Sequence, residues 1–464
     1  MGKRILLFLD GSWIPGAAGS AKIKGNLQRL VEMVSPLNEG RDSAQLVYYD
    51  GAESTPLHWK NLIGVGARQQ VLRAYDYLMT HYQRGDQIYC FGASRGAWVA
   101  RNLCGFIDRV GLLPMARRDQ LYSAYQLYRT EQQRPLTSAE QSAYEPCYRK
   151  NVLPDIRMLG VWDTLGAEGV PIPGLMTLSA RIGQRLGRQT IVPTVNRARQ
   201  VMALDELRAP FRVAPWLCLG SELGQHPEVE QLWFAGSHAD VCGYGDPYLG
   251  DRSLLWMVEE AHQTGMVLRP EAMQGLRYRI TRQEQQGATQ TLQNGSPPQV
   301  TREYSTYYRY LERLGWHTEQ RPVGSRQRAE RGEAPILGEA VHPSVDAMVG
   351  IKGGFYRPAN LLKALACGQV RYAYGYQPQY SALYYPDSER RQGERESCLD
   401  VAELNLEGSN YECLVLDRTD TGWGIRCKGP LQQGEVISLK AYAERRTARV
   451  MWVHEERAGI AFAA

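Results

Sequence analysis

Short apolar runs alternate with helix-forming segments through the first half of the chain, and this alternation restricts the fold more than any other feature. Each run is short and is bounded by turn residues, so we interpret the runs as buried strands. Strands that alternate with helices predict an α/β fold, here a mostly parallel sheet with helices on both faces. The expected strands are 3–10, 44–50, 87–94, 155–163 and 229–237, and the expected helices are 26–34, 68–82 and 95–110.

The pattern changes twice in the second half of the chain. Residues 254–376 are mainly helical in pattern, and we expect them to complete a first domain, 1–376, as a helical lid region. Within them, 281–298 is polar enough to predict a long surface loop. Residues 377–390 are rich in Tyr, Pro and Ser and predict a linker. Short alternating runs separated by turns then predict a small all-β barrel over 391–464.

Composition narrows the class of protein. A chain of 464 residues with 43% hydrophobic residues predicts two or three ordinary globular domains. A net charge of +5 is too small to argue for a nucleic-acid polymer as partner. The apolar run Ile5–Leu9 is too short for a secretory signal. The nine scattered cysteines contain no C-x-x-C pair, so we expect reduced thiols, no metal site and a cytoplasmic protein.

Residues 92–96 read GASRG, a G-x-S-x-G motif between an expected strand and an expected helix. A sharp turn at this point lifts the Ser94 hydroxyl off the end of the sheet, and the flanking glycines remove side chains that would clash. The helix behind Ser94 directs backbone N–H groups at an oxyanion formed there. The motif therefore predicts Ser94 as a nucleophile. The alternative is a serine that only caps the helix.

A serine nucleophile needs a histidine base and an acid that orients it. His238 is favoured as the base because it follows an expected strand, at the sheet edge where Ser94 lies. His342 is the second choice. The histidines between Ser94 and the expected barrel are His226, His238, His262, His317 and His342.

For the acid, Asp163 ends an expected strand, whereas its rival Asp205 lies in a segment that we expect to be helical. Asp10 is a third carboxylate at a strand end. We assign the loop after it to the oxyanion hole, with N–H groups of Gly11 or Ser12 joining that of Arg95. A simple turn at Asp10 is the alternative.

Six separated blocks stand out between residues 3 and 365, namely FLDGSW, GDQIYCFGASRGAWVARNLCGFI, GVWDTLGA, ALDELRAPF, LWFAGSHADVCGYGD, and VHPS with FYRPANL. Together they resemble a family of α/β-hydrolases that includes phospholipase effectors of type VI secretion. The resemblance implies an α/β-hydrolase fold, phospholipids as substrate, and Ser94, Asp163 and His238 as the triad.

The chain departs from the family pattern at three places. Ala93 replaces the usual Phe before the serine, and Gln200 stands where the family often has His. The sequence CGYG at 242–245 replaces a run of glycines. None of these changes removes a proposed triad member, but the last puts the shape of the loop behind His238 in doubt.

Near the C-terminus, residues 391–395 read RQGER, an R-x-x-x-R motif, and 417–422 read DRTDTG. Together these motifs resemble those of a PilZ domain, a bacterial receptor for cyclic di-GMP, with Thr419 where that family usually has Ser. Arginine guanidinium groups suit phosphate and guanine recognition. The resemblance implies a cyclic di-GMP site made of Arg391, Arg395, Asp417, Thr419 and Gly422.

Together these features predict a serine esterase or lipase, with phospholipids as the implied substrate, that needs no cofactor and is regulated by cyclic di-GMP. The expected partners are a lipid or ester substrate, a membrane surface touched peripherally, and a protein of a secretion machinery. Delivery out of the cytoplasm by a signal-peptide-independent system stays open. The alternative is a catalytically silent adaptor that responds to cyclic di-GMP on a hydrolase scaffold.

Overall fold

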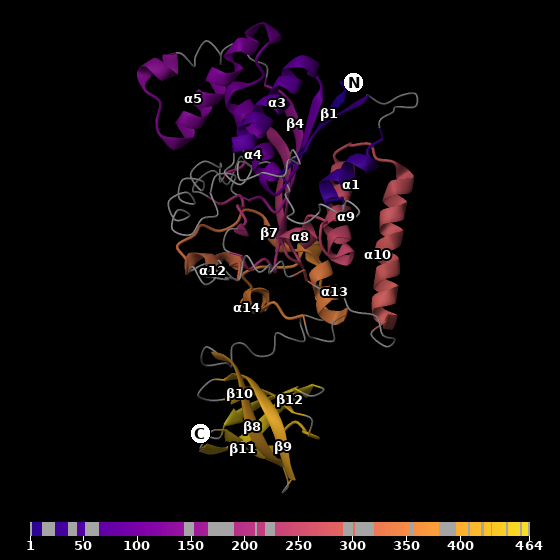
Figure 1. The fold of residues 1–464 in the computed structure, drawn as a ribbon, viewed down its shortest axis with the longest axis vertical. Coiled ribbons are helices and arrows are strands. Elements are labelled where there is room, and N and C mark those ends of the chain that lie inside the picture. The colour runs from indigo at the N-terminus through magenta and orange to yellow at the C-terminus, as the bar shows by residue number, and fades with distance from the viewer. Residues whose placement is uncertain are drawn as a thin grey trace. The chain divides into compact units, whose positions relative to one another are not determined.

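The computed structural model describes residues 2–11, 24–35, 44–51, 65–142, 153–165, 190–208, 211–218, 228–290, 300–301, 320–351, 356–379, 396–406, 409–418, 422–427, 429–441, 444–454 and 457–462. The chain divides into two compact units, Met1–Pro386 and Asp387–Ala464. The first contains a sheet covered by helices, and the second is a small barrel (Figure 1).

The centre of the first unit is a parallel sheet. Among the described residues it has seven strands in the order β2-β1-β3-β4-β5-β6-β7, and every neighbouring pair is parallel. The strands are β1 (Arg4–Asp10), β2 (Gln45–Asp50), β3 (Gln87–Ala93), β4 (Asp155–Trp162), β5 (Val195–Ala203), β6 (Glu228–Phe234) and β7 (Glu339–Val341). Their carboxyl ends therefore lie along one edge of the sheet, which is where ligands bind in open α/β folds.

Helices cover both faces of this sheet, as Figure 1 shows. The helices before β6 are α1 (Asn26–Met33), α3 (Val65–His81), α4 (Arg95–Val110), the 3₁₀ helix η1 (Met115–Gln120) and α5 (Leu121–Gln133). Those after it are α8 (His238–Val241), α9 (Pro247–Gln263), α10 (Pro270–Gln290), α12 (Gly324–Ala329), α13 (Ser344–Ile351), α14 (Ala359–Ala366) and the 3₁₀ helix η4 (Ala373–Gly375).

The strands read as continuous apolar runs because both of their faces are buried. In β1, Ile5, Leu7 and Leu9 join one core cluster with α3, α4 and α5. Leu6 and Phe8 alternate with them and join the opposite cluster, with α1, α9 and α10. This alternation fixes the register of β1, since a slip of one residue would exchange the two faces.

The α/β fold and the parallel sheet predicted from sequence are confirmed, but β5 escaped prediction. Its polar residues hide the strand pattern, yet Arg199 is buried and paired with Glu260 and Glu228. Asp205 was expected to lie in a helix, and this is wrong because it follows the end of β5.

Two further expectations for 254–376 need correction. The polar segment at 281–298 was expected to be a loop, but α10 continues to Gln290. The residues of α10 are mainly polar because this helix touches the core along one side only, through Met273, Leu276 and Ile280. The segment also contains the strand β7, which pairs with β6 and so belongs to the sheet.

The second unit is a closed barrel with the strand order β10-β13-β12-β11-β8-β9, which confirms the predicted small all-β module. Every paired strand runs antiparallel. Its core is made by residues such as Leu404, Val415, Ile425 and Ile460. The strands are β8 (Glu396–Leu406), β9 (Ser409–Arg418), β10 (Gly422–Cys427), β11 (Val436–Ala441), β12 (Glu444–His454) and β13 (Arg457–Phe462).

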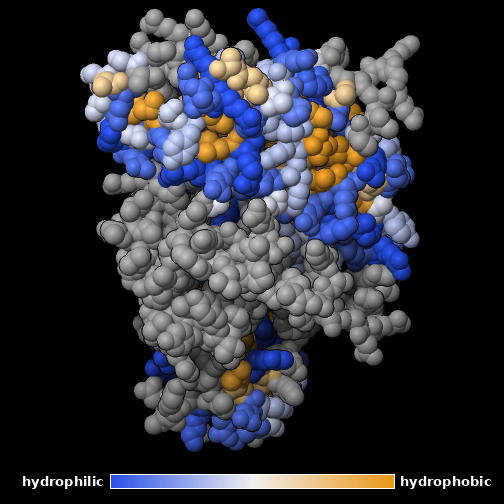
Figure 2. Space-filling view, turned by 45° about the horizontal axis from the view of Figure 1, so that its top comes forward, coloured by the Kyte–Doolittle hydropathy of each residue, from blue (hydrophilic) through white to orange (hydrophobic). Residues whose placement is uncertain are grey.

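Polar side chains dominate the described surface on the face drawn in Figure 2, and apolar ones gather there in separate small patches. No helix among the described residues is both long enough and apolar enough to span a bilayer.

The crossing of β1 and α4 depends on a glycine, and substituting it tests the fold. A Cβ at Gly96 would lie 1.9 Å from the Leu9 carbonyl oxygen and 2.7 Å from the Gly11 nitrogen. Since both atoms are backbone, we expect Gly96→Ala to lower the free energy of unfolding by about 2 kcal/mol or more. Chemical denaturation monitored by circular dichroism measures this change.

Gly275→Ala is the matched control. Gly275 lies in α10, and an added Cβ there meets no atom within 4 Å. It should stabilise the protein by about 0.5–1 kcal/mol, because alanine loses less backbone entropy in a helix. A Gly96→Ala protein as stable as the wild type would contradict the proposed crossing.

Candidate active site

Ser94 lies in a sharp turn between β3 and α4. It has φ 59° and ψ −121°, a strained conformation for a residue other than glycine. A Cβ at Gly92 would lie 2.4 Å from the Gly96 carbonyl oxygen, so the turn needs glycine there. The Ser94 side chain makes no capping hydrogen bond to α4, which removes the alternative that it only caps the helix.

His238 is the first residue of the short helix α8, directly after β6. The preceding Ser237 caps α8 and forms a capping box with Asp240, which fixes the direction in which the helix starts. The His238 Nε2 atom lies 3.0 Å from the Ser94 Oγ atom. Nε2 can therefore accept the hydroxyl proton of Ser94.

Asp163 follows β4 and also has a positive φ, 41°. Its Oδ2 atom lies 2.6 Å from the His238 Nδ1 atom, and its Oδ1 atom accepts a 2.9 Å hydrogen bond from the Ala203 N–H. The carboxyl ends of β3, β4 and β6 thus bring together Ser94, Asp163 and His238. In this arrangement Nδ1–H donates to the carboxylate and leaves Nε2 free to accept.

Arg321 is a buried member of the site that sequence analysis did not find. Its guanidinium donates to both oxygens of Asp163, at 2.6 Å and 2.9 Å. Burial opposes ionisation of Asp163, but the Arg321 charge and the His238 hydrogen bond outweigh burial and hold the pKa of this carboxyl below its usual range. No motif surrounds Arg321, and 158 residues separate it from Asp163, so no local sequence signal could have identified it.

Glu206 forms a second ion pair beside the histidine. Its carboxylate accepts two hydrogen bonds of 2.7 Å from the Arg208 guanidinium and one of 3.2 Å from the backbone N–H of His238. Burial opposes its ionisation, yet the pairing with Arg208 lowers the pKa of Glu206. The Arg208 guanidinium lies over the ring of Phe211, and the Phe211 and His238 rings form a T-shaped pair with centroids 5.3 Å apart. Sequence analysis missed all three residues around His238, although they lie in the block ALDELRAPF.

The rival candidates lie elsewhere. Asp205 accepts hydrogen bonds from the Gly236 N–H at 2.6 Å and the Tyr356 hydroxyl at 2.7 Å, so it braces the loop after β6 and does not face His238. His342 stacks on Phe234 with ring centres 4.3 Å apart, and its Nδ1 contacts the Ser344 hydroxyl. His262 lies in α9, while His226 and His317 lie outside the described residues.

Of the residues expected to form the oxyanion hole, the structure describes Gly11 and Arg95. An added Cβ at Gly11 would lie 2.2 Å from the Gly96 nitrogen and 2.8 Å from the Arg95 Cβ, so the loop after β1 touches the first turn of α4. Arg95 is the first residue of α4, so its N–H has no partner within the helix. Ser12 lies outside the described residues. The Asp10 carboxylate accepts a 2.9 Å hydrogen bond from the Tyr49 hydroxyl.

The loop at 242–245, which departs from the family pattern, is held on both sides. A Cβ at Gly243 would lie 2.4 Å from the Asn26 side-chain oxygen, and Gly243 has a φ of 86°, so only glycine suits this position. On the other side, a Cβ at Gly245 would lie 2.0 Å from the Asp240 Oδ1 atom. The Asp240 carboxylate in turn accepts hydrogen bonds from the Ser237 N–H at 2.8 Å and the Thr301 N–H at 2.9 Å. Gln200, another departure from the family pattern, lies apart from this loop. It is buried within the sheet, and its side-chain amide donates a 2.8 Å hydrogen bond to the Gln231 side chain.

In the second unit, Gly422 begins β10 and Asp417 lies in β9. Arg391, Arg395 and Thr419 lie outside the described residues, so the geometry of the expected nucleotide site is not described. Within the described part of the chain, no group of three His, Cys, Asp or Glu side chains is arranged to hold a metal ion.

The family match lies within the first unit. The family described as "T6SS, Phospholipase effector Tle1-like, catalytic domain" matches residues 3–260, which is more than half of the 464 residues. Among curated proteins, an uncharacterized protein of Saccharomyces cerevisiae is 27% identical over 239 residues, covering 46% of this chain and 33% of that protein. The chain thus spans about a third of the length of this relative.

Two solved structures are also similar. A Tle1 effector bound to the VgrG spike of the type VI secretion system is 16% identical with a TM-score of 0.29, covering 53% of this chain and 52% of that chain. An uncharacterized protein from Pseudomonas aeruginosa is 15% identical with a TM-score of 0.35, covering 89% of this chain and 71% of that chain. TM-scores this low carry no argument about function.

The depressed pKa of Asp163 predicts how stability depends on pH. Its ionised form stabilises the fold above the unfolded-state value of about 3.9, and this contribution is lost as the pH falls below that value. We expect Asp163→Asn to lower the free energy of unfolding at pH 7 by about 3–5 kcal/mol, since it leaves the buried Arg321 unpaired. The difference from the wild type should shrink below about pH 4.

Urea unfolding at a series of pH values measures this difference. The exposed Asp119 in η1 provides the control, since Asp119→Asn should change stability little at any pH. A stability difference for Asp163→Asn that stays constant or grows in acid would contradict the ion pair.

Proposed function

The chain belongs to the family of Tle1-like phospholipase effectors of type VI secretion, whose catalytic domain its residues 3–260 match, and we propose that it is a serine hydrolase of lipid esters. The observation that carries this proposal is the unbroken series of hydrogen bonds from Ser94 through His238 to Asp163. Phospholipids are the substrate that we propose first, because the family is one of phospholipases.

In the proposed reaction, the Ser94 hydroxyl attacks the ester carbonyl carbon while His238 Nε2 takes up its proton. The negative charge that develops on the carbonyl oxygen is stabilised by the N–H groups of Arg95 and Gly11. The ester C–O bond then breaks, and His238 returns the proton to the departing alcohol. Water attacks the acyl-enzyme by the same steps and releases the fatty acid.

Asp163 keeps the imidazole in the tautomer that this reaction requires and stabilises the imidazolium that forms. The 2.6 Å hydrogen bond to Nδ1 supports that role. A lipid ester also requires peripheral contact with a membrane surface. Because the family consists of effectors of type VI secretion, we propose that a protein of that machinery is a partner and that the chain is delivered by it.

Substitution of the nucleophile tests the proposal. We expect Ser94→Ala to fold normally and to lose hydrolysis of a p-nitrophenyl ester and of phospholipid vesicles by at least about a thousandfold, because the covalent route is removed. A fluorophosphonate probe should label the wild type but not this variant. Ser123→Ala, at an exposed serine of α5, should keep both activity and labelling.

The same experiment separates the enzyme from the alternative reading. A wild-type chain that neither reacts with the probe nor hydrolyses any ester would favour a silent adaptor on a hydrolase scaffold. Activity of Ser94→Ala at the wild-type level would instead show that the nucleophile is another residue.

We further propose that the barrel binds cyclic di-GMP and regulates hydrolysis. The support is a closed barrel in which Asp417 lies in β9 next to Gly424 of β10, together with the R-x-x-x-R motif at 391–395. Two arginines in one short segment suit a ligand with two phosphates, and a carboxylate suits a guanine edge.

Calorimetry on the full chain tests this ligand. We expect micromolar or tighter binding of cyclic di-GMP, which Arg391→Ala or Arg395→Ala weakens by roughly ten- to a hundredfold through loss of charge-assisted hydrogen bonds. Arg449→Ala, at an exposed arginine of β12, should leave the affinity unchanged. Ester hydrolysis should change on saturation. If millimolar cyclic di-GMP produces neither heat of binding nor thermal stabilisation, the barrel is not a receptor for it.

A further inference from the structure

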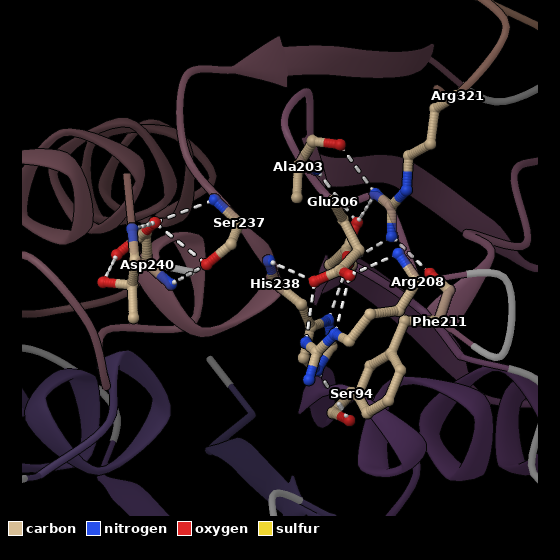
Figure 3. Close-up of polar contacts among 11 residues, drawn as sticks. Ser94, Ala203, Glu206, Arg208, Phe211, Ser237, His238, Asp240 and Arg321 are labelled. Carbon is tan, nitrogen blue, oxygen red and sulfur yellow. Dashed lines mark hydrogen bonds and ion pairs between the residues drawn. The ribbon is translucent and has the colours of Figure 1, made fainter. Parts of the chain in front are cut away.

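Arg321 is held by more contacts than an ion pair alone requires. Besides the two oxygens of Asp163, its guanidinium donates to the carbonyl oxygens of Ala203 at 2.7 Å and Phe211 at 2.5 Å. Its own carbonyl oxygen accepts a 2.8 Å hydrogen bond from Asn360 of α14. Only 4% of Arg321 is exposed, so water competes little for these bonds. Figure 3 shows its guanidinium beside Ala203 and Phe211, on the side of His238 away from Ser94.

These contacts connect three segments that position the proposed catalytic groups. Asp163 follows β4, Ala203 ends β5, and the Phe211 ring packs against the His238 ring in a T-shaped contact. Asp163 has the strained φ of 41°, which persists only where surrounding contacts enforce it. The bidentate pair with Arg321 supplies such contacts and directs Oδ2 toward His238 Nδ1.

Charge balance gives Arg321 a second role. Two buried carboxylates, Asp163 and Glu206, contact His238, and two buried arginines, Arg321 and Arg208, pair with them. The four charges sum to zero around the His238 ring. An imidazolium that forms during hydrolysis is then balanced by the oxyanion on the substrate, so the buried site gains no net charge.

From this geometry we propose that Arg321 is a positioning residue of the hydrolytic site, acting on His238 through Asp163. The proposal rests on the function proposed above. It also means that the catalytic machinery continues beyond residue 260, where the family match ends. The segment after the matched domain then completes the site rather than only covering it.

Kinetics of an arginine series test the proposal. Arg321→Met should lower kcat on a p-nitrophenyl ester by at least about tenfold with KM changed less than about threefold, because substrate contacts stay and only the base is misplaced. Arg321→Lys should recover part of this loss, since it keeps the charge but not the two-point geometry. Added guanidinium ion should partly restore Arg321→Met.

Arg328→Met is the matched control. Arg328 is a buried arginine of α12 in the same part of the chain, and it pairs with Glu333 and the Ala334 carbonyl oxygen. Its loss should lower thermal stability and leave kcat within about threefold of the wild type. An equal fall in kcat for Arg328→Met and Arg321→Met would show a merely structural effect and overturn the proposal.

A double-variant cycle with Asp163→Asn decides whether Arg321 acts through Asp163. In the Asp163→Asn background, Arg321→Met should reduce kcat by no more than about threefold further, because the group that it positions is already lost. Losses that multiply would overturn the proposal. Should the Arg321→Met single variant not fold, Arg321→Lys replaces it in the cycle.

The rate of labelling by a fluorophosphonate separates this proposal from the proposed function. A wild type that is not labelled at Ser94 overturns both. A labelled wild type, with Arg321→Met labelled equally fast, overturns the role of Arg321 and leaves the hydrolase intact. Slower labelling of Arg321→Met, with normal labelling of Arg328→Met, supports both.

Discussion

A single buried carboxylate, that of Asp163, joins the parts of the first unit that make its site. Its oxygens accept hydrogen bonds from His238 of α8, from the Ala203 N–H at the end of β5 and from Arg321. A buried carboxylate is costly without such partners, so the fold provides each of them from a different segment. The positions of His238, of two strand ends and of the distant Arg321 therefore depend on this one group.

Features that depend on local sequence pattern could be predicted from the sequence. The runs in β1 and β3 are apolar on both faces, and the turn at 92–96 carries the glycines that its backbone needs, so the sheet and the Ser94 turn could be predicted. The strand β5 could not, because Arg199 and Gln200 are polar residues whose partners lie in other strands and helices. The continuation of α10 was missed for the related reason that a polar helix surface and a polar loop have the same composition.

In the candidate site, too, the residues at strand ends could be predicted and their long-range partners could not. Ser94 and Asp163 end expected strands and His238 follows one, and parallel strands bring their carboxyl ends to one edge. Arg321 pairs with Asp163, 158 residues away, and Glu206 reaches the backbone N–H of His238, 32 residues away. Single-residue patterns carry no information about such long-range contacts. The choice between Asp163 and Asp205 as the residue that contacts His238 also depended on tertiary structure, since both follow strands and only their partners differ.

The residues of the site are far apart in the sequence, and this decides when the site can assemble during synthesis. Asp163 and Arg321 are 158 residues apart, and Ser94 and His238 are 144 apart. Contacts this far apart in sequence form late, because closing a long loop costs entropy before any contact repays it. During synthesis, the acid lacks its counter-charge until residues beyond Arg321 have left the ribosome. A nascent or partly unfolded chain thus has the Ser94 turn without the hydrogen bonds that join Ser94, His238 and Asp163, and these form only when the first unit is complete.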